Sequence, residues 1–373
     1  MPMAVERAIR RAWRRQGADG RLLHLGLLPL SALFATAVEL RAASYRLRLR
    51  RTLQLAAAVV SVGNLAVGGT GKTPTTLWLA ERLRERGYRV AIVSRGYGGR
   101  ARGATVVGEA RSAEVPASRD PGVIGDEGLM LARRFQGPVI VGAERAAAGA
   151  LAIREFEAEV LVLDDAFQHW ALQRDFDLVC WRASGFGEER LLPAGRLREP
   201  LRAVRRAQAV LVTEEEGERL GARVERAFGG LPVYHGRLRA TALVTPDGEV
   251  WRELPMGALA AHRALGVAGL SDPQPFYRTL QEWDARLDDF LEFPDHHDYT
   301  LEDWKKIANR SRGLDLVVTT EKDLVKLERF PFAKDKLAAV RVSMEIERGD
   351  SLVESVVAAV DQRRRALSAE RVG

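Results

Sequence analysis

Residues 63–74 read GNLAVGGTGKTP and directly follow the apolar run AAAVVSV at 56–62. A turn of small residues lets several successive backbone N–H groups point at one anion, and the helix that follows adds the positive end of its dipole. Pro74 suits a first helical turn, the stretch TTLWLAERLRER at 75–86 continues the helix, and Gly87 ends it. The order of strand, glycine-rich loop and helix predicts a phosphate-binding loop.

The end of this loop matches the Gly-Lys-Ser/Thr pattern of P-loop nucleotide-binding proteins, although Ala66 replaces the first glycine of the full pattern. We predict that Lys72 reaches the β- and γ-phosphates of ATP and that Thr73 binds Mg²⁺. A structural turn without a ligand is the alternative. The predicted nucleotide-binding residues are Gly68, Gly69, Thr70, Gly71, Lys72 and Thr73.

Short apolar runs alternate with helical patterns from residue 57 to about 213, and this alternation decides the fold class. We predict an α/β fold with a P-loop-containing, mostly parallel sheet and helices on both faces, plus a second, smaller α/β lobe joined by a β-strand linker. The predicted divisions are 1–50 (a basic and apolar membrane-associating segment), 51–231 (the P-loop domain), 232–254 (a hairpin-like linker), 255–345 (the smaller lobe) and 346–373 (a C-terminal helix).

Three further groups of polar residues are candidates for chemistry. Asp164 and Asp165 end the apolar run at 160–163, where the ligands of open parallel sheets gather, and we predict that they hold Mg²⁺. Asp126 and Glu127 precede a helical pattern, so one carboxylate is a candidate for Mg²⁺ and the other for a reacting hydroxyl. Either pair is also compatible with simple helix capping.

Histidines are few, so the pair in FPDHHDYT at 293–300 is informative. A histidine beside a carboxylate can orient or assist a catalytic base, and a hydrogen-bonded surface loop is the alternative. Three basic or polar loops, SRGYGGR (94–100), LLPAGRLREP (191–200) and VVTTEKDLVKL (317–327), are candidates for binding phosphate or sugar.

Composition favours a folded enzyme. The chain has 373 residues, 46% hydrophobic residues and a formal net charge of +7, which indicates anionic partners. The single cysteine, Cys180, excludes an internal disulfide and a thiolate zinc site, and indicates a reducing compartment. Nucleic-acid binding is disfavoured because aromatic residues are not interleaved with the basic ones.

The N-terminal segment is basic and apolar. Arginines that include Arg7, Arg10 and Arg14 precede the apolar run at 22–38, which is shorter than a spanning helix requires. The pattern fits an interfacial anchor, in which arginines meet anionic lipid phosphates, and equally an amphipathic helix packed on the protein's own core.

Together these residues resemble the tetraacyldisaccharide 4′-kinase family, the lipid A kinases of Gram-negative bacteria. The resemblance is carried by VGNLAVGGTGKTP, VSRGYGG, GDEG, LDDAFQH, LPAGRLREP, FPDHHDY and TTEKD, which follow one another in the family's order between residues 62 and 323. It implies transfer of the γ-phosphate of ATP to the 4′-hydroxyl of an acylated disaccharide 1-phosphate, at the cytoplasmic face of the inner membrane, by a peripheral or N-terminally anchored enzyme without an obligate protein partner. A P-loop ATPase or GTPase of the switch or metallochaperone type is the alternative.

The resemblance also implies roles for single residues. Asp126 becomes the catalytic base and pairs with His296, and Glu127 becomes a metal-side ligand. Because Asp126 lies in the predicted P-loop domain and His296 in the smaller lobe, we expect closure of a cleft to complete the site. The implied substrate-binding residues are Arg95, Gln168, His169, Arg198 and Glu199.

Overall fold

The chain folds into two compact units, each made of discontinuous segments. The computed structural model describes residues 8–372 apart from 10, 14, 113, 184–189, 214–223, 225–226, 249, 271 and 334. Unit 1 comprises residues 1–93, 144–237 and 344–373, and unit 2 comprises 94–143 and 238–343. Arg7, Arg10 and Arg14, the arginines that precede the N-terminal apolar run, lie outside the described residues.

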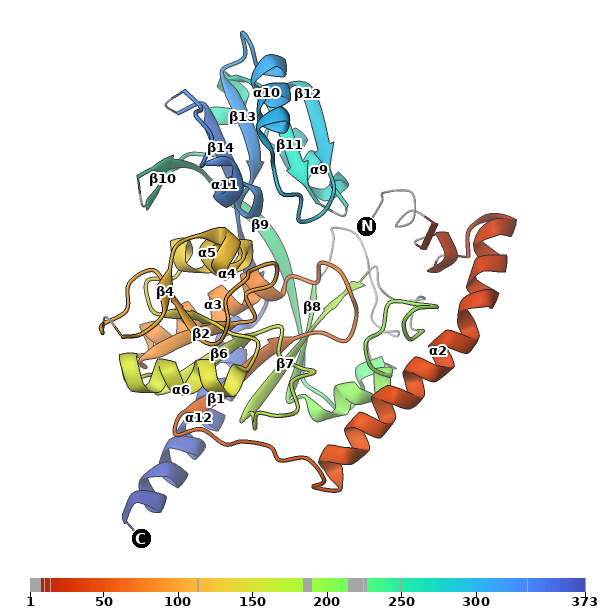
Figure 1. The fold of residues 1–373 in the computed structure, drawn as a ribbon, viewed down its shortest axis with the longest axis vertical. Coiled ribbons are helices and arrows are strands. Elements are labelled where there is room, and N and C mark those ends of the chain that lie inside the picture. Colours follow the sequence, from red (N-terminus) through yellow and green to blue (C-terminus); the bar gives the residue numbers. More distant parts are fainter. Residues whose placement is uncertain are drawn as a thin grey trace. The chain divides into compact units, whose positions relative to one another are not determined.

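Unit 1 is built on parallel strands in the order β8-β7-β1-β6-β2 (Figure 1). Nearly all of their residues are buried, as expected for apolar runs that are covered on both faces. The first residues of β9 add to β8 in parallel register. The bounds are β1 Ala58–Gly63, β2 Val90–Ser94, β6 Val160–Asp164, β7 Phe176–Arg182, β8 Ala209–Thr213 and β9 Val233–Asp247.

Helices cover the apolar strands of this sheet. Helix α3 (Lys72–Glu85) packs against β1 and β6, and α12 (Gly349–Val372) packs against β1, β7 and α3. Helix α6 (Arg145–Phe156) packs against β6, and the 3₁₀ helix η2 (Leu201–Arg206) contributes Val204 to the core around Trp181 and Phe228.

Unit 2 contains a second parallel arrangement, in which β11 pairs with β12 and β13, and β13 pairs with β14. Strand β10 pairs with β9 in antiparallel register. Strand β3 pairs with β4 in parallel register and with β5 in antiparallel register. The strands are β3 Thr105–Val107, β4 Ala117–Ser118, β5 Val139–Val141, β10 Val250–Leu254, β11 Arg263–Gly269, β12 Arg286–Phe293, β13 Leu316–Thr320 and β14 Leu337–Ile346. The helices are α4 Pro121–Ile124, α5 Asp126–Arg134, α8 Ala258–Ala261, α9 Gln274–Glu282, α10 Leu301–Arg310 and α11 Glu321–Leu327.

The predicted fold class is confirmed, since the structure is a mostly parallel α/β sheet with helices. The division of the chain differs from the predicted one because residues 94–143, expected in the P-loop domain, cluster with 238–343. Asp126 and His296 therefore belong to the same unit. The expectation that closure of a cleft completes the site remains a prediction.

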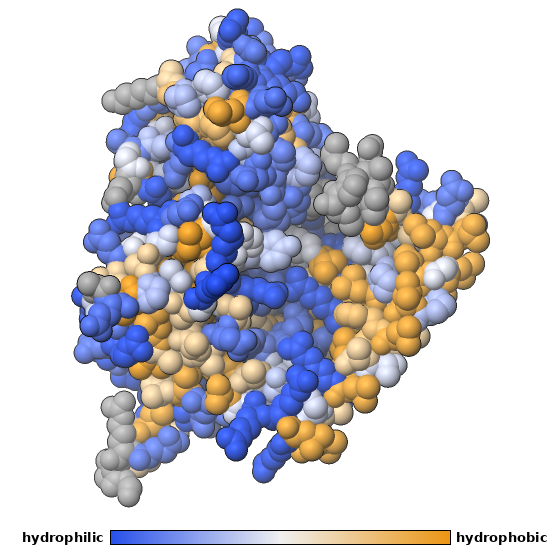
Figure 2. Space-filling model, viewed as in Figure 1, coloured by the Kyte–Doolittle hydropathy of each residue, from blue (hydrophilic) through white to orange (hydrophobic). Residues whose placement is uncertain are grey.

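Helix α2 (Gly17–Arg46) precedes the sheet of unit 1 and extends beyond the predicted apolar run on both sides. Gly20, His24 and Ser31 are buried, and the Ser31 hydroxyl donates to the carbonyl of Leu191 at 2.9 Å. Hydrophobic side chains gather along α2 on the face seen in Figure 2. Its exposed leucines include Leu22, Leu25, Leu30, Leu33 and Leu40.

Among the described residues, α2 alone is long and apolar enough to cross a membrane. The most apolar part of the helix is only 6% buried. Length and composition are weak evidence for a membrane span, because signal sequences and core helices share them.

Candidate active site

The predicted phosphate loop connects β1 to α3 in unit 1. Gly68 and Gly71 have φ values of 109° and 75°, in the left-handed region that favours glycine. Gly71 is the residue before the first turn of α3, so free backbone N–H groups at the start of this helix are available to a phosphate. The Thr70 hydroxyl accepts a hydrogen bond from the side-chain amide of Asn64 at 2.9 Å, which ties the loop to the end of β1.

Asp164, the last residue of β6, lies beside this loop. Its carboxylate accepts hydrogen bonds from Thr76 Oγ1 at 3.1 Å and from Thr73 Oγ1 at 3.4 Å, and the residue is 2% exposed. The structure thus brings together two of the predicted metal ligands, Thr73 and Asp164.

These two residues fit Mg²⁺, because a hydroxyl and a carboxylate are the hard oxygen ligands that this ion prefers. Among the described residues, no group of three or more His, Cys, Asp or Glu side chains is placed to hold a metal ion.

Asp165 has a different environment. Arg198 Nη1 donates to both carboxylate oxygens of Asp165, at 3.0 Å each. Lys72 Nζ lies 4.0 Å from Oδ1. Burial raises the pKa of Asp165, but the charges of Lys72 and Arg198 outweigh it and hold the pKa below its ordinary value. Asp165 has φ of 51°, a left-handed conformation that a few non-glycine residues adopt at functional sites.

The loop at 190–200 braces the phosphate loop from the side. The backbone N–H of Val67 donates to Arg196 O at 2.9 Å, and that of Arg198 donates to Leu65 O at 2.7 Å. The Arg196 guanidinium also donates to Val67 O, at 3.0 and 3.2 Å. These bonds fix the backbone at Arg196 and Arg198, and the Arg198 side chain reaches Asp165 from there.

Glu199, predicted to bind substrate, lies inside unit 1. It is 5% exposed, and its carboxylate contacts Arg206 Nη1 at 2.7 Å and Trp170 Nε1 at 3.4 Å. The Arg206 guanidinium stacks over the rings of Phe167 and Trp170. These contacts give Glu199 a structural role and argue against direct substrate contact.

Gln168, His169 and Arg95 are the remaining predicted substrate-binding residues. The Gln168 side chain donates to Asn64 O at 2.8 Å, so it stands beside the phosphate loop. The backbone carbonyl of His169 accepts from Arg174 Nη1 at 2.6 Å. Arg95 is exposed in the loop after β2 and belongs to unit 2.

The second group of predicted residues lies in unit 2 around Asp126, the first residue of α5. Gly125 precedes it with φ of 81°, and a Cβ atom there would lie 2.4 Å from the Tyr97 carbonyl oxygen. Glycine is therefore required at this position, and the loop at 95–100 lies against the start of α5. Glu127 follows in the first turn of α5, partly buried.

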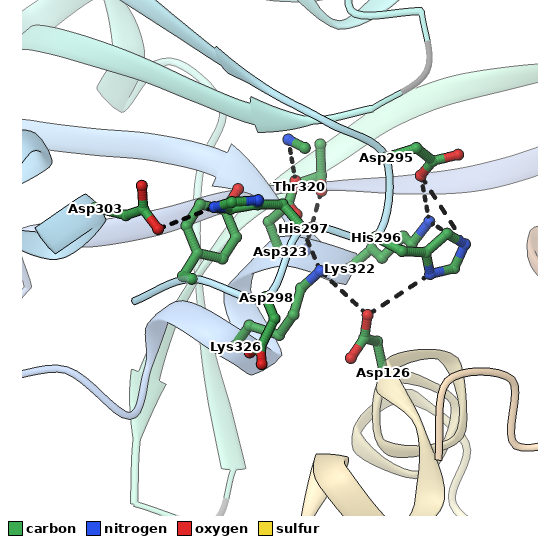
Figure 3. A network of polar contacts seen from close by, with 12 residues as sticks. Asp126, Asp295, His296, His297, Asp298, Asp303, Thr320, Lys322, Asp323 and Lys326 are labelled. Atoms are coloured by element: carbon green, nitrogen blue, oxygen red, sulfur yellow. Dashed lines mark hydrogen bonds and ion pairs between the residues drawn. The ribbon is translucent and has the colours of Figure 1, made fainter. Parts of the chain in front are cut away.

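Two side chains contact the Asp126 carboxylate, both at Oδ2 (Figure 3). Lys326 Nζ lies 3.1 Å away and His296 Nδ1 lies 3.8 Å away. Burial raises the pKa of Asp126, but the contact with His296 and the charge of Lys326 outweigh it and hold the pKa below its ordinary value. Asp126 is therefore ionised at neutral pH, and both of these contacts from the described part of the chain leave Oδ1 to a further proton donor.

Lys326 is itself held by buried groups. Its side chain is 5% exposed, its ammonium lies 3.6 Å from Asp323 Oδ1, and it sits 5.6 Å from the centre of the Tyr299 ring. The fully buried Asp323 is fixed in turn, because Oδ2 accepts from Gly269 N and from Thr320 Oγ1, each at 2.9 Å.

The two adjacent histidines point to different partners (Figure 3). His296 faces Asp126, whereas His297 Nε2 lies 2.9 Å from Asp303 Oδ2. Asp303 and Thr300 form the capping box of α10, so His297 secures the loop to that helix.

Lys326, Asp323 and Lys322 were not named as site residues from the sequence. They belong to the stretch at 317–327, and a signal was present there. Asp323 and Lys326 are spaced three apart within the otherwise apolar DLVKL, the spacing that places two side chains on one side of a helix.

Comparisons with known proteins show the family of this chain. The model of the family described as tetraacyldisaccharide-1-P 4′-kinase (LpxK) matches residues 23–361. The tetraacyldisaccharide 4′-kinase of Anaeromyxobacter dehalogenans is 41% identical over 359 residues, which cover 93% of each chain. That of Syntrophus aciditrophicus is 38% identical over 363 residues, covering 92% of this chain and 95% of its own.

A solved structure is similar over nearly the same length. The crystal structure of the "apo" form of LpxK from Aquifex aeolicus, in complex with ATP, has a TM-score of 0.74 and 30% sequence identity, and the match covers 91% of this chain and 99% of that one. On the family match and on these relatives, the chain belongs to the tetraacyldisaccharide-1-P 4′-kinase family.

Proposed function

We propose that this chain transfers the γ-phosphate of ATP to the 4′-hydroxyl of a tetraacylated glucosamine disaccharide 1-phosphate, the step that forms the lipid IVA precursor of lipid A. Family membership supports this activity over the alternative of a switch or metallochaperone ATPase. The observation that carries it in the structure is Asp126, an ionised carboxylate whose two contacts both engage Oδ2.

The residues of unit 2 supply the proton acceptor. As the 4′-oxygen forms its bond to the γ-phosphorus and the bond to the β-phosphate oxygen of ATP breaks, the hydroxyl proton passes to Asp126 Oδ1 and ADP leaves. Lys326 and His296 hold the carboxylate, and Lys326 balances its charge until the proton arrives.

The residues of unit 1 supply nucleotide binding. Backbone N–H groups of the phosphate loop and Lys72 bind the phosphates, and Arg198 and Lys72 keep Asp165 in place beside the loop. Thr73 and Asp164 would hold Mg²⁺, which neutralises charge on the β- and γ-phosphates when bound. Glu127 remains a further predicted ligand of this ion.

We place the enzyme at the cytoplasmic face of the inner membrane, associated through α2. The exposed leucines of α2 would enter the headgroup boundary, and the arginines near its ends would meet anionic lipid phosphates. In vesicle flotation, Leu25→Gln combined with Leu33→Gln should reduce binding to vesicles that contain phosphatidylglycerol. Leu301→Gln, at an exposed leucine of unit 2, is the control. Equal binding of both variants would contradict the role of α2.

The test of the activity is transfer of label from γ-³²P-ATP to the tetraacyldisaccharide 1-phosphate in detergent micelles. Label should appear in the lipid only with Mg²⁺, be lost in Lys72→Ala, and fall about 100-fold or more in Asp126→Asn. Lys305→Met, at an exposed lysine of α10, should behave as wild type. Free phosphate without labelled lipid would instead favour the switch-type ATPase.

A further inference from the structure

The ammonium of Lys322 contacts Nε2 of His296, the ring nitrogen that faces away from Asp126 (Figure 3). The mechanism above gives this contact no role. We propose that Lys322 is a positioning residue that holds His296 as the Nδ1–H tautomer and thereby directs a hydrogen-bond donor at the catalytic carboxylate. The role of Lys322 rests on the proposed function for its effect on catalysis, whereas the tautomer of His296 does not depend on that function.

Lys322 lies in the first turn of α11 and is only 17% exposed at its side chain. Its ammonium is 2.8 Å from Asp295 Oδ1 and 3.0 Å from His296 Nε2. An ammonium has three N–H donors and no acceptor. At the contact with His296, Lys322 must therefore donate, and Nε2 must accept.

That requirement decides the proton position on the ring. A neutral imidazole has one N–H donor and one acceptor nitrogen, so acceptance at Nε2 places the proton on Nδ1. Nδ1 is the nitrogen that faces Asp126 Oδ2, at 3.8 Å. The opposite tautomer would set an N–H against the Lys322 ammonium, which lies 3.0 Å from Nε2.

The ring is also held by groups other than Asp126. Tyr97 lies against it with ring centres 5.0 Å apart, and the His296 backbone has φ of 56°. A left-handed conformation is uncommon for a non-glycine residue and persists where the surroundings impose it. Among the described residues, the groups that face the imidazole are Asp126, Asp295, Lys322 and Tyr97, and Lys322 makes the shortest contact with a ring nitrogen, at 3.0 Å.

The tautomer matters for Asp126. With Nδ1 protonated, the positive end of the N–H faces Asp126 Oδ2 at 3.8 Å, the oxygen that Lys326 also contacts. With Nδ1 unprotonated, a lone pair would face a carboxylate oxygen, which is repulsive and would release the side chain from its position. Loss of Lys322 should therefore disturb the catalytic carboxylate although Lys322 does not touch it.

Nitrogen NMR of the full chain labelled with ¹⁵N-histidine tests the proposal directly. The His296 signals are assigned by their loss in His296→Gln, and spectra are compared at a pH where the ring carries one proton, found by titrating the same signals. The wild type should show Nε2 unprotonated and Nδ1 protonated. Lys322→Met should populate the Nε2–H form at least several-fold more, and Lys322→Arg, which still donates, should restore the wild-type pattern.

The opposite results would overturn the proposal. These are a wild-type ring with Nε2–H, a ring that stays doubly protonated throughout, or a Lys322→Met spectrum identical to that of wild type. Lys305→Met, at an exposed lysine of the same unit, controls for loss of a charge. If Lys322→Met does not fold, the wild-type and Lys322→Arg spectra still decide the tautomer.

Activity provides the second measurement. Lys322→Met should lower kcat about 10-fold with KM for ATP within about 2-fold, and Lys322→Arg should recover most of the loss. An unchanged kcat in Lys322→Met would contradict the positioning role. A wild-type enzyme that labels no lipid would overturn the proposed function instead, and the NMR result would stand separately.

Discussion

Lys326 Nζ lies 3.1 Å from Asp126 Oδ2, although the two residues are 200 positions apart in the chain. The lysine is almost fully buried, and Asp323, which is completely buried, lies on its other side. One cation therefore balances two carboxylates in unit 2. Removing it leaves both carboxylates without their main counter-charge.

Lys326→Met should consequently destabilise unit 2 by about 3 kcal/mol, the cost of breaking a buried ion pair from one side. Urea denaturation at pH 7 measures the change, and Lys305→Met is the control. A second variant, Lys326→Met with Asp323→Asn, should recover part of the loss because it removes one of the two buried charges. Equal stability of wild type and Lys326→Met would contradict this assignment.

Stability should depend on pH through Asp126. An unfolded aspartate titrates near pH 3.9, and the folded pKa of Asp126 is lower. Its contribution to folding is therefore complete above about pH 5 and is lost as the pH falls through the depressed folded value. The difference in unfolding free energy between wild type and Asp126→Asn should be constant from pH 7 to 5 and shrink below about pH 4.

Urea midpoints taken from pH 3 to pH 7 measure this difference. The control is Asp298→Asn, since the Asp298 side chain is 88% exposed. A difference that does not change over the whole range would show that the carboxylate is not held as described.

Substitution of His296 should mainly lower kcat, whereas substitution of His297 should mainly lower stability. His296→Ala should lower kcat about 100-fold because it removes the contact with the catalytic carboxylate. His297→Ala should lower stability by about 1 kcal/mol, because it loses the hydrogen bond to the α10 capping box, and should leave kcat within about 3-fold of wild type. Steady-state kinetics and urea denaturation of both variants distinguish the roles, and equal loss of kcat would refute the separation.

Gly125→Ala should damage the site through the backbone. Its Cβ would lie 2.4 Å from the Tyr97 carbonyl oxygen, and its φ of 81° is itself unfavourable for alanine. Gly98→Ala is a matched control, because Gly98 has φ of 80° but open space around its Cβ position.

Thermal unfolding should show a loss of about 1 kcal/mol for Gly98→Ala and at least about 1 kcal/mol more for Gly125→Ala. The excess measures the overlap with the Tyr97 backbone. If the two variants lose the same stability, the contact between the two loops does not constrain the site.

Metal dependence should be traceable to Thr73. Chelation of Mg²⁺ with EDTA should abolish transfer, and Thr73→Ala should raise the Mg²⁺ concentration needed for half-maximal activity about 10-fold or more, since it removes a hydroxyl ligand. Thr73→Ser retains the hydroxyl and should stay near wild type. The Mg²⁺ dependence of lipid labelling provides the measurement, and an unchanged dependence in Thr73→Ala would exclude the ligand.

The phosphate loop was predictable from the sequence because its signal is local. The glycines, Lys72 and Thr73 are consecutive, and the flanking strand and helix have clear apolar patterns. Asp164 followed from the rule that ligands gather at the carboxyl ends of parallel strands, and the structure places it beside Thr73.

The rest of the site depends on contacts between distant segments. The pairing of Asp126 with His296 came only from the family resemblance, and the roles of Lys322 and Lys326 were missed because the contacts of α11 with α5 are not encoded locally. The different grouping of residues 94–143, which cluster with 238–343 and not with the P-loop segment, has a related cause. Alternation of strands and helices continues through this region and does not indicate which unit its short strands join.

Helix α12 has a consequence for how the protein is made. It packs against β1. Arg363 Nη2 donates to the carbonyl of Leu55, just before β1, at 2.9 Å. The hydroxyl of Tyr88, between α3 and β2, donates to Asp361 at 2.8 Å. These partners are separated by about 300 residues of synthesis. While the ribosome is still translating unit 2, the nucleotide-binding sheet lacks this cover, so the nascent chain exposes an apolar surface that a chaperone can recognise until translation passes residue 360.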